Sequence, residues 1–342
     1  MTRERLVTGK SATGEEEDFT WSLRPKTIQE YIGQKNIIEK LSISIEASRI
    51  REEPHEHLIL YGPPGLGKTT LAHIIARELD SRLVTTTGPA LSRIADLMGI
   101  LTNLDRKDIL FIDEIHRLPK AVEEFIYPAM EDFRVDFVVD KGPFSKVINV
   151  PLKRFSLVGA TTRIGLLSAP LRDRFGMSYH LDFYPPEEIC KIILRSAGLL
   201  DVGIDKEAAD IIAKRSRGTP RIANRLLRRV RDYATVKADG VITVELAEKS
   251  LKMEGIDSRG LDDLDRSLLK IIIDYYDGGP VGIDAVAATL SEETDTLEEL
   301  VEPYLLKIGF LMRTKRGRTA GQEAYRHLGI PFKGSVQGSL FE

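Results

Sequence analysis

The chain has 342 residues, of which 42% are hydrophobic, so it can bury more than one core and should form two or three domains. Its 49 Lys and Arg residues nearly balance 52 Asp and Glu residues, which excludes a surface of one sign and requires any nucleic acid to meet a local basic patch. A single cysteine, Cys190, excludes an internal disulfide and argues against a cysteine-based metal site. With no apolar stretch of membrane-spanning length, the sequence predicts a cytoplasmic protein.

The chain begins with a polar arm over residues 1–20, which carries an acidic run and which we expect to be disordered. Behind it, an extended stretch with Leu23 and Arg24 is followed by an apolar corner at Tyr31 and Ile32. These two pairs could clasp a nucleobase from opposite sides. Plain packing against the domain is the alternative, and the pattern does not decide between them.

The stretch from Gly62 to Thr70 reads GPPGLGKTT and lies between an apolar run that predicts a strand and an amphipathic segment that predicts a helix. It fits the spacing G-x-x-x-x-G-K-[ST], in which backbone N–H groups and a helix N-terminus converge on phosphate oxygens. Lys68 is expected to reach the β- and γ-phosphates and Thr69 to ligate Mg²⁺. A chance glycine-rich turn is the alternative, but the strand-to-helix context favours a nucleotide site.

After the helix that follows this phosphate loop, the sequence predicts a strand over 82–87, a helix over 92–104 and a buried strand over 108–114. The last strand ends in two carboxylates, as strands do where an open α/β sheet presents its carboxyl edge to a site. Asp113 is expected to hold Mg²⁺ through its water shell and Glu114 to polarise the attacking water. Carboxylates at a strand end are otherwise solvated turn residues.

A helix over 119–132 precedes a segment that alternates apolar and polar residues over 133–139, turns, and returns as a second strand over 145–150. The pattern predicts a β-hairpin inserted between two strands of the sheet. Its apolar tip around Phe144 has no core of its own, which favours docking of a partner. Folding of the hairpin onto its own domain is the equal alternative.

A further buried strand over 155–162 ends in hydroxyls, and Thr161 is expected to sense the γ-phosphate or hold the attacking water. The short helix end over 170–176 displays arginines. An arginine there would reach the nucleotide of a neighbouring subunit if the phosphate loop's own face is already lined. An ion pair with Asp173 is the plainer alternative.

The doubled proline at 185–186 predicts a domain boundary, because the composition beyond it turns helical. Helices are predicted over 186–197, 206–217, 219–238 and 243–254. Thr219 is expected to cap the third of these helices, with Pro220 at its first position, so that Arg221 extends from the first turn. Arg221 is either an exposed arginine or a cation that reaches the γ-phosphate and couples hydrolysis to domain rotation. A solvated helix face is the interpretation of the later arginines Arg225, Arg228, Arg229 and Arg231.

Beyond a linker over 255–260, the sequence predicts helices over 261–276, 283–290 and 294–308 and a strand–turn–strand over 310–319. Three helices with such a wing are typical of a winged-helix domain. The wing holds the local basic patch, which consists of Arg313, Lys315, Arg316 and Arg318. These cations could lie along a phosphate backbone and add affinity without reading sequence, whereas a solvated loop is the alternative.

In chain order, the phosphate loop, the Asp113-Glu114 strand end, the strand-end threonines, Arg174 and the Gly-Thr-Pro-Arg helix start resemble the AAA+ ATPases. More narrowly, longer strings resemble the RuvB family of bacterial Holliday-junction branch-migration motors, and this resemblance extends from Leu23 to about Pro331. The strings lie at 23–27, 31–34, 62–70, 113–118, 127–132, 159–163 and 313–318.

The resemblance implies an α/β fold with three domains behind the arm over 1–20. These are an AAA+ P-loop NTPase domain with a parallel sheet over 21–184, a small helical lid domain over 185–255 and a C-terminal winged-helix DNA-binding domain over 256–342. The resemblance also implies an ATP hydrolase that uses Mg²⁺, forms a homo-hexameric ring on double-stranded DNA and drives branch migration in recombination, DNA repair and the SOS response. It implies that RuvA docks on the 133–150 hairpin and that RuvC joins the resolving complex.

The resemblance also assigns site residues. Contacts to the nucleotide are expected from Leu23, Arg24, Tyr31, Ile32, Gly62, Gly65, Gly67, Lys68, Thr69, Thr70, Glu131, Asp132, Phe133, Arg174, Tyr184 and Arg221. Arg174 is expected to be the arginine finger that reaches the ATP of the adjacent subunit, and the expected DNA contacts are Arg313, Arg316 and Arg318. Two departures from the family pattern fall at the wing, where Lys315 replaces the usual proline and Gly321 replaces a common threonine.

Two other functions fit parts of the pattern. An origin initiator or clamp loader of the AAA+ class can also carry a winged helix, and processive movement on DNA would separate it from a branch-migration motor. A nucleotide-gated DNA-binding switch would hydrolyse ATP too slowly to do work, and the presence of Glu114 counts against it.

Overall fold

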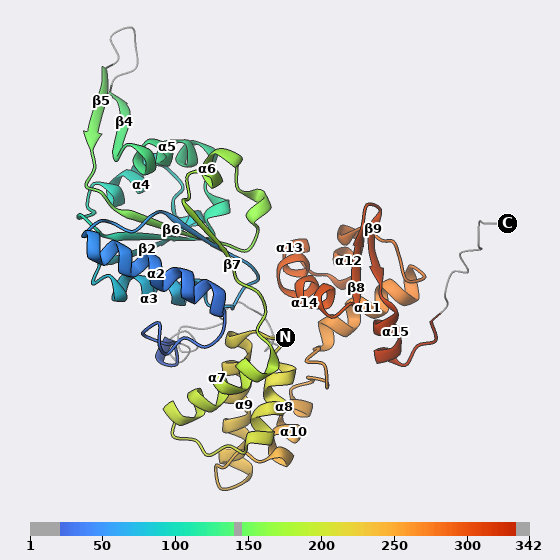
Figure 1. Cartoon of the computed structure of the whole chain (residues 1–342). Coiled ribbons are helices and arrows are strands. Elements are labelled where there is room, and N and C mark those ends of the chain that lie inside the picture. The colour runs from blue at the N-terminus through green and yellow to red at the C-terminus, as the bar shows by residue number, and fades with distance from the viewer. Residues whose placement is uncertain (1–20, 140–145, 333–342) are drawn as a thin grey trace, which may run out of the picture. The chain divides into compact units, whose positions relative to one another are not determined.

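The computed structural model describes residues 21–139 and 146–332 (Figure 1). The polar arm over 1–20 and the hairpin tip around Phe144 lie outside the described residues. The chain divides into two compact units. The sheet unit comprises the described residues up to Ile192 together with Thr219–Arg221, and the helical unit comprises Ile193–Gly218 and the described residues from Ile222 onward.

The sheet unit is built on five parallel strands in the order β2-β3-β6-β1-β7. The strands are β2 (Leu83–Thr87), β3 (Ile109–Asp113), β6 (Ser156–Thr161), β1 (Leu58–Tyr61) and β7 (Met177–His180). Every residue of β6 is buried, because helices cover both faces of the parallel sheet. Apolar runs predicted the first four strands. The edge strand β7 was missed, because it alternates partly buried and exposed residues and offers no apolar run.

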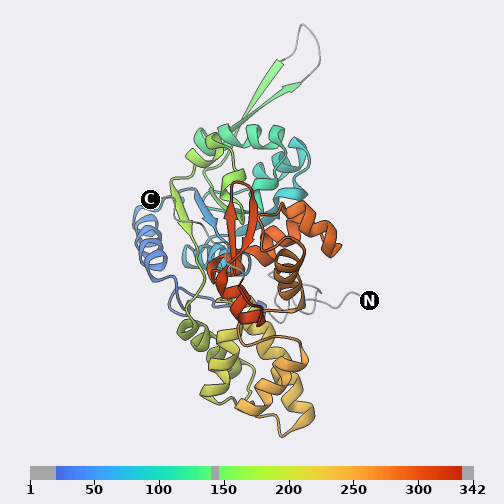
Figure 2. The same ribbon diagram turned by 90° about the vertical axis from the view of Figure 1, so that its right-hand side faces the viewer.

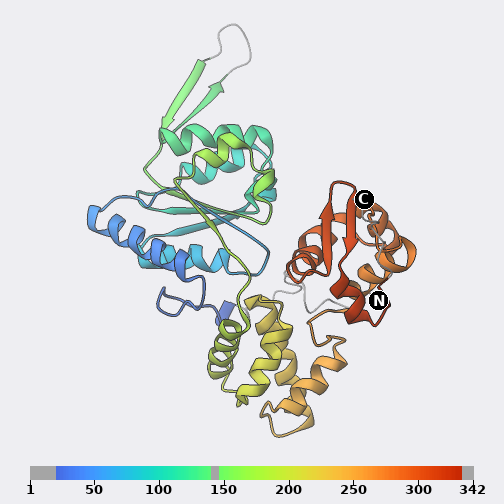
Figure 3. The same cartoon turned by 45° about the vertical axis from the view of Figure 1, so that its right-hand side comes forward.

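Helices cover both faces of this sheet (Figure 1, Figure 3). One face carries α2 (Lys35–Arg51) and α3 (Lys68–Glu78), and the other carries α4 (Ile94–Leu101), α5 (Lys120–Glu131) and α6 (Ala169–Asp173). On the second face, the alternate strand residues Leu110 and Ile112 pack with Ile126 of α5 in one apolar cluster. Burying one such side chain stabilises the fold by about 1.5–3 kcal/mol, so the cluster fixes the strand ends that carry the site.

The predicted hairpin insertion is confirmed. It pairs β4 (Arg134–Val139) with β5 (Lys146–Pro151) in antiparallel register. The hairpin extends away from the sheet and helices of its unit in both views (Figure 1, Figure 2). Ile148 on β5 is exposed. Val135 of β4 is buried in the apolar cluster of the sheet unit, so the base of the hairpin packs on its own domain. The tip, on which the two alternatives differ, lies outside the described residues.

Four helices follow the sheet, as predicted. They are α7 (Pro186–Leu199), α8 (Lys206–Arg215), α9 (Pro220–Lys237) and α10 (Val244–Met253). The interpretation of the arginines on α9 as a solvated face was wrong, because Arg225 is buried and Arg228, Arg229 and Arg231 are partly buried. Eight residues of α9 are buried, including Arg225. The buried face of the helix is therefore wider than its apolar stripe and includes the aliphatic part of an arginine side chain.

The winged-helix pattern is confirmed in the second part of the helical unit. Its elements are α11 (Asp263–Tyr275), α12 (Ile283–Leu290), α13 (Thr294–Thr296), the π-turn η4 (Leu297–Val301), α14 (Glu302–Lys307), β8 (Leu311–Thr314), β9 (Gly317–Ala320) and α15 (Gln322–Leu328). The third predicted helix is interrupted by the π-turn just before Pro303, a residue that lacks an N–H and disturbs the helical bonding of the preceding turn. The final helix α15 was not anticipated.

A buried ion pair joins the two parts of the helical unit. Arg217, which follows α8, binds both carboxylate oxygens of Asp265 on α11, and the two side chains are 2% and 0% exposed. Nε of Arg217 also donates to the carbonyl oxygen of Gly260 at 2.8 Å. A Cβ at Gly260 would lie 2.4 Å from the carbonyl oxygen of Arg215, so the segment predicted as a linker ends in a packed corner.

Candidate nucleotide site

The phosphate loop lies at the carboxyl edge of the sheet, because it follows β1 and leads directly into α3. Gly62 and Gly67 have φ angles of 139° and 105°. A Cβ at Gly62 would lie 2.2 Å from the carbonyl oxygen of Leu181, and one at Gly67 would lie 2.8 Å from the hydroxyl of Tyr31. Both positions therefore require glycine, and the loop backbone can approach a phosphate closely.

Lys68 begins α3 and is held within the curve of the loop. Its Nζ donates to the carbonyl oxygens of Gly62 at 2.8 Å and of Pro63 at 2.9 Å. Thr70 is buried in the same first turn. A phosphate group would offer the ammonium full negative charges in place of carbonyl dipoles, so the loop fits a nucleoside triphosphate.

Thr69 and Asp113 bring oxygen atoms together beside the loop. The hydroxyl of Thr69 donates to Oδ2 of Asp113 at 3.3 Å, and Oδ1 of Asp113 accepts from the N–H of Glu114 at 2.9 Å. Glu114 lies in the left-handed region and forms an ion pair with Arg117 at 3.4 Å. Hydroxyl and carboxylate oxygens are the ligands that Mg²⁺ prefers, so this pair fits the ion expected from the sequence.

Two tyrosine hydroxyls contact the backbone of the loop. Tyr184 donates to the carbonyl oxygen of Leu66 at 3.1 Å, and the hydroxyl of Tyr31 lies 2.8 Å from that of Tyr184. Burial raises the pKa of Tyr184 to about 12 and the pKa of Tyr31 well above its ordinary value of 10.0, so both stay neutral near pH 7. The corner continues through Ile32 to Gly33, where a Cβ would lie 2.4 Å from the Tyr184 ring.

Leu23 and Arg24 lie beside α3, the helix that follows the phosphate loop. Leu23 is buried, and the guanidinium of Arg24 lies 4.7 Å from the ring centroid of Trp21. That ring contacts His73 of α3 edge-on, with the centroids 4.5 Å apart. Burial and the charge of Arg24 lower the pKa of His73 below its ordinary value of 6.5. The structure therefore places this segment against α3, and its contact with a nucleobase stays a prediction.

Arg221 reaches the loop from the first turn of α9. Its backbone N–H donates to the carbonyl oxygen of Gly65 at 3.4 Å. A Cβ at Gly65 would lie 2.8 Å from Cγ2 of Thr219, so the two segments are closely packed. Arg221 is partly buried, and the alternative of a plain exposed arginine is wrong.

The two threonines at the end of β6 have different surroundings. Thr161, the predicted sensor, is fully buried, and its hydroxyl lies 2.9 Å from Nδ1 of His116 and accepts from the N–H of Arg163 at 3.0 Å. Thr162 is the residue that follows the last position of β6. Its hydroxyl is buried and has no partner in the part of the chain that the structure describes. The geometry therefore favours Thr162 in place of Thr161 as the open hydroxyl.

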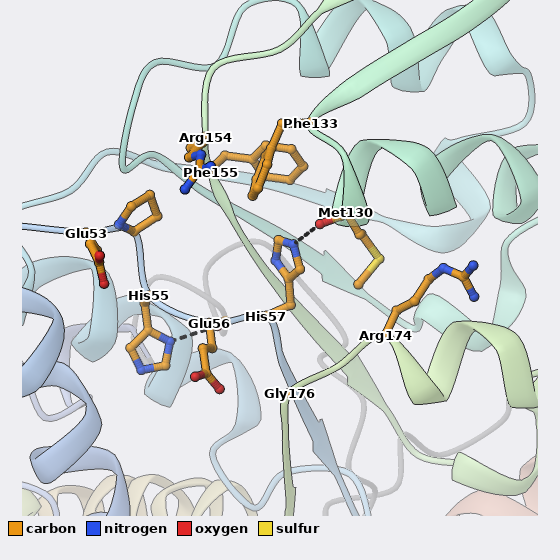
Figure 4. Close-up of a pocket in the computed structure, with 11 residues that line it drawn as sticks. Glu53, His55, Glu56, His57, Met130, Phe133, Arg154, Phe155, Arg174 and Gly176 are labelled. Atoms are coloured by element: carbon orange, nitrogen blue, oxygen red, sulfur yellow. Dashed lines mark hydrogen bonds between the residues drawn. The ribbon is translucent and has the colours of Figure 1, made fainter.

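A second group of predicted residues lies at the opposite, amino edge of the sheet. Phe133 and Arg174 line a cavity of about 370 Å³ with residues that precede the strands, such as His57 before β1 and Phe155 before β6 (Figure 4). The structure does not bring this group to the chain's own phosphate loop. Its members are Glu131, Asp132, Phe133 and Arg174.

Arg174 is held at the rim of this cavity. Its Nη1 donates to the carbonyl oxygen of Pro170 at 2.6 Å, and its Nη2 donates to Oε2 of Glu131 at 3.1 Å. The guanidinium carbon lies 4.3 Å from the ring centroid of Tyr127. The plainer alternative of an ion pair with Asp173 is therefore wrong for Arg174, which pairs with Glu131.

The chain matches one family along most of its length. Residues 23–181 match the Holliday junction DNA helicase RuvB P-loop domain, residues 184–257 match the RuvB AAA lid domain and residues 258–329 match the RuvB C-terminal winged helix domain. The chain belongs to the RuvB family. It is an AAA+ protein whose α/β sheet, helical lid and winged helix are those of RuvB, as predicted.

Individual RuvB proteins are similar over nearly the whole chain. The Holliday junction branch migration complex subunit RuvB of Kosmotoga olearia is 55% identical over 327 residues, which cover 96% of this chain and 95% of that protein. The protein of the same name from Desulfosudis oleivorans is 57% identical over 317 residues, which cover 93% and 92%. The solved structure of the RuvB Holliday junction branch migration motor of Thermotoga maritima is 53% identical, with a TM-score of 0.84, and covers 91% of this chain and 99% of that one.

In this RuvB-family chain, the wing pairs two of its arginines internally. Nε of Arg313 donates to Oε2 of Glu302 at 2.9 Å, and Nε of Arg318 donates to Oε1 of the same carboxylate at 2.8 Å. Glu302 is fully buried. Lys315 and Arg316 are exposed at the turn between β8 and β9. The basic patch is therefore divided between a paired base and an exposed tip.

Sequence reasoning missed three residues that the structure brings forward in this RuvB-family chain: Thr162, Tyr127 and Arg217. The sequence around Thr161 and Thr162 does not reveal that the hydroxyl of Thr161 is engaged by His116 from another segment. Tyr127, on an amphipathic helix, reads as a core residue, and nothing near Arg217 in the sequence points to its distant partner.

No helix among the described residues is long and apolar enough to cross a bilayer.

Proposed function

We propose that this chain is an ATP-driven translocase on double-stranded DNA that moves Holliday junctions in recombination and repair, working as a hexameric ring with RuvA. The observation that carries this proposal is the division of the predicted nucleotide residues between two edges of one sheet. Lys68 and Arg221 lie at the carboxyl edge, whereas Arg174 lies at the amino edge. One copy can hold a nucleotide, and a second copy completes the site.

At the carboxyl edge, Lys68 binds the β- and γ-phosphates while the loop N–H groups surround them. The hydrogen bonds from Tyr31 and Tyr184 hold the loop backbone in shape before the nucleotide arrives. Leu23, Arg24 and Ile32 flank the nucleobase. These contacts bind ATP and orient it for attack.

Thr69 and Asp113 are the residues that would hold Mg²⁺. Within the described ranges, no group of three or more His, Cys, Asp or Glu residues gathers to bind a metal ion, so phosphates and water would supply the remaining ligands. When bound, the ion neutralises charge that develops on the phosphates.

Glu114 is proposed as the general base that accepts a proton from the attacking water. Its ion pair with Arg117 holds the carboxylate aside and has to open before the carboxylate can turn to the water. The hydroxyl of Thr162 positions the water or the γ-phosphate. Thr161 and His116 hold the strand end in place, and burial lowers the pKa of His116, which keeps this ring neutral.

Arg174 is proposed to reach the ATP of the adjacent subunit, with Glu131, Asp132 and Phe133 forming the receiving edge around it. An arginine finger supplied in this way accelerates hydrolysis by roughly 10³ to 10⁵. Arg221 reports loss of the γ-phosphate to α9, and the helical unit moves as a consequence. Hydrolysis therefore requires the ring.

The helical unit carries the proposed DNA contacts. Arg316 at the exposed tip of the wing, with Arg313 and Arg318 behind it, contacts the phosphate backbone without reading sequence. The hairpin over 133–150, which exposes Ile148, docks on RuvA. RuvC is proposed to join the resolving complex, and the protein is proposed to work in the bacterial cytoplasm. The proposed domains span residues 21–184, 185–255 and 256–342.

Branch migration of a synthetic four-way junction tests this function. The chain should convert the junction to duplex products only with ATP, Mg²⁺ and RuvA. Glu114→Gln should bind ATP and the junction but leave the junction unconverted, because the general base is lost. Conversion without ATP, or a wild-type chain that hydrolyses ATP on junction DNA with RuvA and never converts it, would contradict the proposal.

A further inference from the structure

Three contacts orient the guanidinium of Arg174. The ring of Tyr127 on α5 faces it, with the guanidinium carbon 4.3 Å from the ring centroid, which is within the range of a cation–π interaction. The carbonyl of Pro170 and the carboxylate of Glu131 accept from its two terminal nitrogens at 2.6 and 3.1 Å. Nε is buried and has no partner among the described residues. The ring therefore contacts one face of the group, and the two acceptors hold its terminal nitrogens.

The hydroxyl of Tyr127 fixes the short helix that leads to Arg174. It donates to Oε1 of Glu123 at 2.6 Å and lies 3.2 Å from Oγ of Ser168. Ser168 also donates to Glu123, and its Oγ accepts from the N–H of Leu171 at 3.2 Å as the N-cap of α6. One side chain thus contacts both the start of α6 and the arginine that follows the end of α6.

We propose that Tyr127 is the positioning residue of the arginine finger, with its ring contacting one face of the guanidinium and its hydroxyl holding α6 through Ser168 and Glu123. This inference rests on the proposed function, because it requires Arg174 to act on the ATP of a neighbouring subunit. Tyr127 itself touches no reacting group. Its effect is to hold the cation in the productive geometry before the subunits meet, so that no reorganisation is needed during hydrolysis.

Burial and the bond to Glu123 raise the pKa of the Tyr127 hydroxyl above its ordinary value of 10.0. The hydroxyl therefore remains a neutral donor across the working range of pH.

The test measures kcat and KM for ATP hydrolysis by full-length rings on duplex DNA. Tyr127→Leu removes the ring and the hydroxyl and should lower kcat by roughly 5- to 30-fold, the rate equivalent of a lost cation–π contact. KM should stay within about two-fold, because the chain's own phosphate loop is untouched. Tyr127→Phe keeps the ring and should recover most of the loss. The matched control is Tyr179→Leu, which removes another partly buried ring of the sheet unit, one whose hydroxyl donates to Sδ of Met177, and it should leave kcat unchanged.

Two further measurements separate positioning from damage to the fold. On an Arg174→Ala background, Tyr127→Leu should cause no further loss of the residual rate measured in a single turnover with excess enzyme, because the group that it positions is gone. In mixed rings, Lys68→Ala subunits carry an intact finger and should restore hydrolysis to Tyr127→Leu subunits, whose phosphate loops are intact. Additive losses, a raised KM or no rescue would overturn the inference.

The failure of this inference and the failure of the proposed function are distinguishable. If Arg174→Ala leaves kcat unchanged, the finger assignment in the proposed function is wrong. If Arg174→Ala abolishes hydrolysis while Tyr127→Leu leaves kcat unchanged, the finger stands and only the positioning role of Tyr127 is overturned.

Discussion

Two arginines in this chain, Arg174 and Arg217, use the same side chain in opposite ways. Arg217 is 2% exposed and binds both oxygens of a carboxylate, that of Asp265, which is also buried. Arg174 is 22% exposed and pairs with Glu131, whose side chain is about half exposed. The first arginine is enclosed within the fold, and the second lies at a rim from which it can be offered to another molecule.

Burial decides what each arginine can do. Removing one partner of a buried pair leaves an uncompensated charge and costs about 3–5 kcal/mol, whereas an exposed pair contributes about 0–1 kcal/mol. A motor needs both kinds of contact. The Arg217 pair joins the lid helices to the winged helix. The proposed finger role requires Arg174 to exchange the half-exposed carboxylate of Glu131 for a phosphate.

The largest expected effect on stability comes from Asp265→Asn. It leaves the guanidinium of Arg217 buried without a counter-charge and should lower the opening free energy of α9 and α11 by about 3–5 kcal/mol. Hydrogen exchange of the amides in these two helices measures that loss locally. The control is the double variant Arg217→Met with Asp265→Leu, which should recover most of the stability because no charge remains buried. An unaltered exchange rate in Asp265→Asn would mean that the ion pair does not stabilise the contact between these helices.

A smaller effect is expected from Glu131→Gln. Its carboxylate is half exposed, so the loss should reduce the opening free energy of α6 by less than about 1 kcal/mol. Hydrogen exchange of α6 under the same conditions gives the direct comparison with Asp265→Asn. A loss as large as that of Asp265→Asn would remove the contrast between the two arginines.

The smallest expected effect on stability is the pH dependence contributed by His57, which lines the same cavity as Arg174 (Figure 4). Its Nδ1 accepts from the N–H of Leu157 at 2.8 Å, and its Nε2 donates to the carbonyl oxygen of Met130 at 3.0 Å, so the neutral ring fits. Burial lowers its pKa below the ordinary value of 6.5 and outweighs the bond to Met130. Since the unfolded chain takes up the proton first, stability is fully present above pH 6.5 and is lost as the pH falls from there toward the lowered folded pKa.

Thermal unfolding at pH 7.5 and at pH 5.5 checks this sign. The wild type should lose stability on acidification, and His57→Gln should lose less because its side chain does not titrate. Other histidines with a lowered pKa, including the partly buried His116, add to the slope, so the informative quantity is the difference between the two proteins. An identical slope in both would show that His57 does not contribute.

Local sequence patterns predicted the buried strands that are followed directly by polar site residues. The phosphate loop, the carboxylates of β3 and the hydroxyls of β6 each follow an apolar run, and the strand and turn geometry follows from that spacing. The edge strand β7 has no such run and was missed. The π-turn before Pro303 was also missed, because a break in helical bonding leaves the apolar periodicity nearly unchanged.

Contacts between distant residues could not be predicted in the same way. The hydroxyl of Thr161 is engaged by His116, which comes from another segment, and the sequence around Thr161 and Thr162 does not reveal that contact. The pairing of Arg217 with Asp265 spans 48 positions. The buried arginine on α9 has the same cause, since a charged residue beside an apolar stripe reads as solvated until the neighbouring helices are in place.

The measurement that tests the central claim most directly is ATP hydrolysis by rings mixed from Lys68→Ala and Arg174→Ala subunits on duplex DNA. Each variant alone should be inactive, the first because it cannot hold the phosphates and the second because it offers no finger. In an equal mixture, roughly one seam in four joins an intact phosphate loop to an intact finger, and hydrolysis should return in that proportion. No recovery at any ratio, or full activity of Arg174→Ala rings alone, would contradict a site completed by the neighbouring subunit.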